Sequence, residues 1–264
     1  MKLIACICNQ PQRLAAALEP VRAALVAQPP VSRWGLGYVQ GGDVLLVRTP
    51  KASATPVDLA GPLLAHESDL RTDCAIALAV GEAGTLSGTD NTPPFRFRRW
   101  LYAHTGWGAA ADEHATPKLL ERVPEYLRRN IRGRTAGEVA FHVFLAALHD
   151  TGALDDANIS PALARRALAN ALQQIEAAGA APLGTVALTN GRCMVVAHGA
   201  EPLRVRRLWV MAETGRAERD ESFRGFLLVT GPEAEAKDGF EDVPANKAVE
   251  VSRDLSMSFA DLRP

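Results

Sequence analysis

Four cysteines are the most reactive side chains in this sequence, and only Cys6 and Cys8 lie close enough together to act jointly. Alternate residues of a β-strand face the same side, so a strand here would bring both thiols into one place, where a metal or a disulfide could form. No Cys or His pair with zinc-site spacing accompanies them. The sequence therefore favours two small apolar residues of a core strand.

The six histidines show no metal-ligand spacing, and we expect neither a metal nor any other cofactor. His104 invites a catalytic role, because an imidazole titrates near neutral pH and this one precedes Thr105 and Gly106. We interpret it as a partly buried, hydrogen-bonded residue of the framework.

Three arginine clusters suggest another kind of chemistry, the binding of a polyanion such as nucleic acid. The clusters are Arg96, Arg98 and Arg99; Arg128, Arg129, Arg132 and Arg134; and Arg204, Arg206 and Arg207. The formal net charge is only −1, so the whole protein does not attract nucleic acid or a lipid surface. We therefore expect surface arginines paired with nearby acids, and neither nucleic-acid nor membrane binding.

The composition is that of a folded globular protein. The chain has 264 residues, of which 47% are hydrophobic and 22% charged. The apolar run of residues 1–8 is too short for a secretion signal, and no segment approaches the ~20 apolar residues that span a bilayer. We predict a first strand there, one domain over residues 1–264, and a cytoplasmic protein.

The remaining elements form blocks of strands and helices. We predict helices over residues 13–28, 116–129, 135–149 and 160–179, with Pro117, the Thr135-Glu138 capping box and Pro161 as their start signals. Strands are predicted over residues 34–39, 43–48, 74–80, 99–104, 185–188, 193–197, 206–212 and 226–229. Strands on both sides of a helical block predict an α+β layered architecture.

Two segments of the sequence resemble the signature motifs of class II glutamine amidotransferases. They are Asn91-Thr92-Pro93-Pro94-Phe95 and the run from Trp100 to Gly106, where that family has Asn-Thr-His-Pro-Phe and Trp-x-x-Ala-His-Asn-Gly. The opening residues with Pro11, the segment Trp34-Gly35-Leu36-Gly37 and the capping box are also similar to family segments. The resemblance implies the N-terminal-nucleophile fold, an α-β-β-α four-layer sandwich of two antiparallel sheets.

The family's reaction, as the resemblance implies it, needs a terminal cysteine that attacks the glutamine amide and an Asn and a Gly amide that stabilise the oxyanion. An Arg then binds the substrate carboxylate and an Asp its ammonium group. In an ungapped alignment, Lys2 stands at the position of the family's nucleophile. Thr105 stands at the position of the oxyanion-binding Asn, and Ala136 at the position of the Asp. The loop after Val80, where the Arg belongs, contains none.

The residues that support the scaffold, in contrast, match the family. We therefore predict a pseudoenzyme that binds or regulates, with a small ligand or a protein as its partner and no catalytic residue. The alternative is an active amidotransferase in which processing makes Cys6 the terminal nucleophile. We expect Lys2 to point to solvent at a frayed end of the chain; if it does not, it could offer a point charge to an anionic ligand. The predicted degenerate pocket positions are Lys2, Trp34, Gly81, Glu82, His104, Thr105, Gly106, Ala136 and Gly137.

Overall fold

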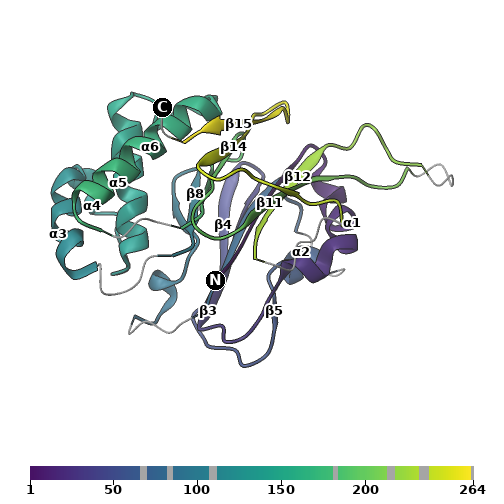
Figure 1. The fold of residues 1–264 in the computed structure, drawn as a ribbon, viewed down its shortest axis with the longest axis horizontal. Helices are drawn as coiled ribbons and strands as arrows, with labels where there is room; N and C mark the ends of the chain where they lie inside the picture. The colour runs from purple at the N-terminus through teal and green to yellow at the C-terminus, as the bar shows by residue number, and fades with distance from the viewer. Residues whose placement is uncertain are drawn as a thin grey trace.

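A computed structural model gives the fold, and it describes residues 1–65, 70–81, 86–106, 112–180, 184–212, 218–231 and 238–262. Two antiparallel sheets lie face to face, with helices on both outer sides (Figure 1). The N-terminal helices cover one sheet and the helices of the middle of the chain cover the other. The predicted α-β-β-α sandwich of two antiparallel sheets is confirmed.

The first sheet has seven strands among the described residues, in the order β13-β11-β12-β1-β6-β3-β4. The chain's first strand thus lies at the centre of this sheet, between β12 and β6, and every one of its seven residues is buried. The strands are β1 (Lys2–Cys8), β3 (Arg33–Gln40), β4 (Asp43–Thr49), β6 (Cys74–Val80), β11 (Leu203–Leu208), β12 (Gly225–Thr230) and β13 (Glu241–Asp242).

The second sheet has six strands in the part of the chain that is described, in the order β15-β14-β10-β9-β8-β7. They are β7 (Phe95–Phe97), β8 (Trp100–His104), β9 (Val186–Thr189), β10 (Met194–Ala197), β14 (Lys247–Val251) and β15 (Met257–Asp261). A separate short pair joins β2 (Val26–Ala27) to β5 (Val57–Asp58).

The helices form the outer layers. They are α1 (Leu14–Leu18), α2 (Gly61–Leu64), α3 (Asp112–Arg122), α4 (Glu125–Arg128), α5 (Ala136–Asp150) and α6 (Pro161–Ala177), with 3-10 turns at Pro11–Arg13, Glu19–Leu25 and Thr89–Asn91. Three apolar cores follow from this layering, one between the sheets and one under each helical layer. Helix α5 is buried over 13 of its 15 residues, because it packs on the six-stranded sheet under α3 and α6.

Two predicted helices are wrong in extent. The helix predicted over residues 13–28 is only five residues of α-helix, since Pro20 lacks an N–H and the chain continues as a 3-10 turn into β2. The helix predicted to start at Pro117 begins earlier, at Asp112, and ends before Pro124. The predicted strand over residues 206–212 lies three residues earlier, as β11.

The other predicted elements are confirmed to within a residue or two. Strands β14 and β15 were not predicted individually, because β15 has an irregular pattern of exposure and includes the exposed Phe259. No helix within the described ranges has the length and apolar character needed to cross a bilayer.

Candidate functional site

The two sheets meet at the end of the sandwich where β1 begins and β8 ends. The backbone N–H of Gly106, which follows β8, donates a hydrogen bond to Sδ of Met1 over 3.3 Å. A β-carbon added at Gly81, just after β6, would lie 4.0 Å from the nitrogen of Met1. Residues that are 105 positions apart in sequence are thus neighbours here.

Lys2 lies in the seven-stranded sheet and not in solvent. It is 5% exposed and lies opposite Ala79 of β6, which in turn lies opposite Trp34 of β3. Directly opposed residues of antiparallel strands point to the same face. Lys2 and Trp34 therefore share the face that carries Ile4 and the core under the N-terminal helices. The prediction that Lys2 points to solvent at a frayed terminus is wrong, because pairing on β6 orders the chain from residue 2 onward.

Thr105 is fully buried, and its polar groups are engaged with the segment that leads into β9. Its hydroxyl oxygen accepts from the N–H of Thr185 at 3.0 Å, and its backbone bonds to both Thr185 and Gly184 at 2.8 and 2.7 Å. A β-carbon at Gly184 would lie 2.5 Å from Thr105 Oγ1. The threonine side chain is therefore directed at its neighbouring strand, where glycine leaves room for it.

His104 lies between Thr105 and the first turn of helix α5. Its Nδ1 is 3.2 Å from the carbonyl oxygen of Thr105, and a β-carbon at Gly137 would lie 2.5 Å from its Nε2. Burial lowers the pKa of His104 from 6.5 to about 4. The imidazole is therefore neutral at physiological pH, in keeping with the partly buried, hydrogen-bonded residue that the sequence predicts.

The N-terminus of α5 is closed by its own capping groups. The Thr135 hydroxyl accepts from the N–H of Glu138 at 3.3 Å. The Glu138 carboxylate turns back to the N–H groups of Arg132 and Gly133, at 2.9 and 2.7 Å, and is only 6% exposed. Ala136, between these two capping residues, is 4% exposed and offers no polar side chain. The Thr135 cap is confirmed, but the reciprocal bond of a capping box differs, because the Glu138 carboxylate accepts from the two amides of Arg132 and Gly133 ahead of the cap residue.

The two neighbouring cysteines lie in the middle and at the end of β1. Cys6 is 1% exposed and pairs with Ala75 on one side and Leu227 on the other. Burial raises the pKa of the Cys6 thiol to about 12, and that of Cys8 to about 12 as well. Both are free thiols that face the core under the N-terminal helices. This agrees with the core-strand interpretation.

The structure therefore gathers most of the predicted pocket positions at one end of the sandwich. Met1 links Gly81 to Gly106, His104 links Thr105 to Gly137, and Trp34 lies in the same row as Lys2. Glu82 lies outside the described residues. The sequence did not reveal Met1, Gly184 or Thr185 as members of this region, because each contributes through a contact between segments far apart in the chain.

The arginine clusters are divided among local partners. Arg98 forms an ion pair with Asp155, Arg129 with Glu125, and Arg204 with Asp242. Arg96 donates to the Val44 carbonyl oxygen at 2.6 Å. Among the residues whose placement is given, no three His, Cys, Asp or Glu side chains are grouped so that they could hold a metal ion.

Comparison with known proteins agrees with this geometry. The family model described as "Glutamine amidotransferases class-II" matches residues 1–219. No curated protein sequence matches the chain.

Solved structures with a similar fold include two that are described as members of this family. One is described as a glutamine aminotransferase class-II domain protein from Silicibacter pomeroyi, with a TM-score of 0.59, 15% identity and 100% of both chains covered. The other, described as a "predicted glutamine amidotransferase" from Pseudomonas aeruginosa, has a TM-score of 0.56 and 13% identity, covering 96% of this chain and 98% of that one. With a family model spanning most of its length and the signature residues assembled at one end of two antiparallel sheets, the chain belongs to the class II glutamine amidotransferases.

Proposed function

We propose that this chain is a member of its family without glutaminase activity, and that it acts by binding a ligand or a protein partner. The observation that carries the proposal is the position of Lys2 and its burial. This residue stands where the family's nucleophile belongs, and it is buried in the central strand of the seven-stranded sheet.

The chemistry of amide hydrolysis supports this view. The family's attacking group is the thiolate of a terminal cysteine, and the side chain of Lys2 has no thiol. The hydroxyl of Thr105 is directed at Thr185 and Gly184 inside the protein, whereas an oxyanion hole needs a donor aimed at the reacting oxygen. Ala136 cannot bind a substrate ammonium group.

The remaining oxyanion donor of the family pattern is also engaged. The N–H of Gly106 is bonded to the thioether of Met1. A substrate carbonyl would have to displace this side chain before it reached the amide.

The environment of Cys6 weighs against the processed alternative. A mature chain that began at Cys6 would lack five residues that precede it, four of them in the central strand β1. The thiol itself is buried, and its raised pKa disfavours the thiolate.

The test is glutamate release from L-glutamine by the purified chain, together with its intact mass. We expect no release above the rate without protein, and a mass that includes residues 1–5. The variants Cys6→Ala and Cys8→Ala form a matched pair, since both residues are buried thiols on one face of β1.

Hydrolysis that is lost in Cys6→Ala and kept in Cys8→Ala would overturn the proposal in favour of the processed enzyme. Hydrolysis that survives both changes would also overturn it, and would point to another nucleophile. The ligand or partner, and the cytoplasmic location, stay predictions; thermal-shift screening of small acids and pull-down with the full chain are the direct approaches.

A further inference from the structure

A second feature lies at the opposite end of the seven-stranded sheet, where the ladder between β11 and β12 opens. The regular pairing ends at Leu208 opposite Gly225. Beyond it, the N–H of Asp220 donates to the Val210 carbonyl oxygen at 2.9 Å, so that Trp209 alone faces the four residues 221–224. This unequal number of residues holds the two segments apart.

The opening is fixed to the body of the protein by side chains of the N-terminal segment. Asn9 donates to the Ser222 carbonyl oxygen and accepts from the N–H of Arg224, both at 2.8 Å. Arg13 forms an ion pair with Asp220 and donates to the Met211 carbonyl oxygen at 2.7 Å. Bonds with Ser222 and with Arg13 lower the pKa of Asp220 to about 2, so this anchor is charged at neutral pH.

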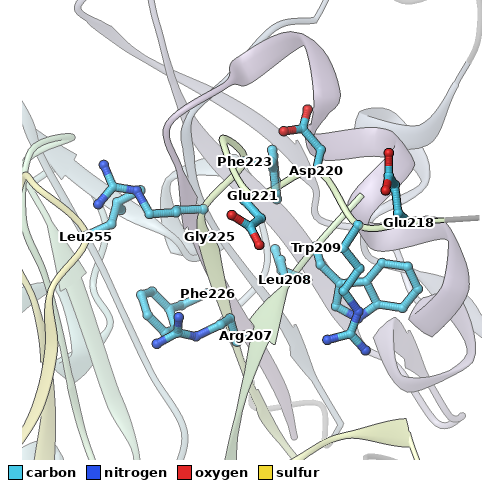
Figure 2. Close-up of a pocket in the computed structure, with 12 residues that line it drawn as sticks. Arg207, Leu208, Trp209, Glu218, Asp220, Glu221, Phe223, Gly225, Phe226 and Leu255 are labelled. Atoms are coloured by element: carbon cyan, nitrogen blue, oxygen red, sulfur yellow. The ribbon is translucent and has the colours of Figure 1, made fainter. Parts of the chain in front are cut away.

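A pocket of about 830 Å³ lies in this opening. Its buried apolar lining comes from two cores, with Leu208 and Phe223 from the core under the N-terminal helices and Phe226 and Leu255 from the core between the sheets. Its charged part is seen in Figure 2, where arginine and glutamate side chains surround the apolar residues. A concave site with an apolar base and a few polar groups is the usual form of a small-molecule site.

Two of the pocket's arginines are oriented by aromatic rings. The guanidinium of Arg219 lies over the Trp209 ring, 4.6 Å from its centroid, and that of Arg207 lies over Phe226 at 5.5 Å. A guanidinium stacked on a ring keeps its N–H edge available for a carboxylate or phosphate. Within the described residues, neither of these arginines nor Arg224 forms an ion pair with a carboxylate.

We propose that this pocket binds a small ligand that combines an aromatic ring with an anionic group, a carboxylate or a phosphate. The apolar base and Trp209 accommodate the ring, and Arg207 and Arg219 bind the anion. Glu221 also lines the pocket, and its carboxylate lowers the affinity for an anion by repulsion. Gly225 lies opposite Cys8, six residues along β1 from Lys2, so the site is ~20 Å from the family's glutaminase position and independent of it.

The test is a set of titrations of the full chain, in which binding is measured by ligand-observed NMR and by tryptophan fluorescence. The probes are benzoate and adenosine monophosphate, each with its uncharged counterpart, benzyl alcohol and adenosine. Inorganic phosphate tests the anion alone. We expect the charged aromatic probe of one pair to bind, with affinity at least about tenfold above its uncharged counterpart. The pair that responds identifies the carboxylate or the phosphate as the natural anion.

Variants separate this pocket from general attraction by arginine. Arg207→Gln and Arg219→Gln should each weaken binding about tenfold, and Glu221→Gln should strengthen it several-fold. Arg129→Gln is the control, since it removes an exposed arginine that follows helix α4 and does not line the pocket. The three pocket residues are exposed, so these variants should fold.

The proposal is overturned if no charged aromatic probe binds at about 10 mM. It is also overturned if uncharged probes bind equally well, or if Arg129→Gln weakens binding as much as the pocket variants do. These results are distinct from any glutaminase result, because Lys2 and Cys6 are unchanged in every variant.

Discussion

The backbone N–H of Gly106 is bonded to the sulfur of Met1, and this contact joins the end of β8 to the start of β1. The neighbouring N–H of Thr105 is bonded instead to the carbonyl oxygen of Thr185, at 2.8 Å. The Gly106 amide therefore reports on the position of the Met1 side chain, and the adjacent Thr105 amide reports on its backbone pairing with Thr185.

Replacement of Met1 by serine, made by cleavage of an N-terminal fusion, should therefore expose the Gly106 amide. Hydrogen exchange measured by NMR should become faster at Gly106, because a serine side chain is too short to reach it. Exchange at Thr105 should stay unchanged and serves as the internal control. Equal protection of Gly106 in both proteins would show that the thioether contact is not maintained in solution.

Gly137→Ala should destabilise the protein by roughly 1–3 kcal/mol, because the added β-carbon would lie 2.5 Å from His104 Nε2 and 3.3 Å from Phe95 Cε2. The gain in helix propensity from Gly to Ala, about 1 kcal/mol, offsets only part of this crowding. Denaturant unfolding of both proteins gives the difference.

Gly61→Ala is the matched control, because it also lies in a helix, and its β-carbon would make only ordinary contacts at 3.6 Å or more. This second variant should be neutral or slightly more stable than the wild type. A Gly137→Ala protein as stable as Gly61→Ala would mean that the imidazole moves aside without penalty.

The free energy of unfolding should decrease as the pH is lowered from 6.5 to 4, because of His104. Burial lowers the pKa of this residue in the folded state to about 4, so below pH 6.5 the unfolded chain takes up a proton that the folded protein refuses. Above pH 6.5 both states are neutral and His104 contributes no slope.

His104→Gln should remove this slope. The difference in unfolding free energy between wild type and variant should change by about 2 kcal/mol between pH 7.5 and 4.5, in the direction that favours the variant at low pH. His142, whose pKa burial also lowers, is present in both proteins and cancels. A difference that does not vary with pH would contradict the lowered pKa of His104.

A chain expressed from Cys6 onward should fail to fold. It loses the buried residues Leu3, Ile4 and Ala5 from the central strand, and each large apolar side chain accounts for about 1.5–3 kcal/mol of burial. With the lost pairing to β6 and β12, this approaches the 5–15 kcal/mol that stabilises a typical protein. Circular dichroism and thermal melting provide the measurement, with a chain lacking only Met1 as the control. A cooperative melt of the shortened chain would restore the processed alternative.

Local signals predicted much of the fold. The Thr135 and Ser160 caps, each with a hydroxyl that accepts from the backbone N–H three residues later, fixed the starts of α5 and α6. The continuous apolar run of residues 74–80 gave β6 to the residue. The segment around Pro20 was less predictable, because its apolar periodicity suits an α-helix while its proline and its packing favour a 3-10 turn.

The sequence by itself determined the family resemblance and the identity of the residues at each motif position, because residue type is independent of folding. Only the tertiary structure decided that Lys2 is buried, that Met1 contacts Gly106, and that Trp209 and the segment 221–224 enclose a pocket. Each of these depends on the pairing of strands that are distant in the chain. The physical reason is that burial and proximity follow from the order of strands in a sheet, which no local pattern of residues specifies.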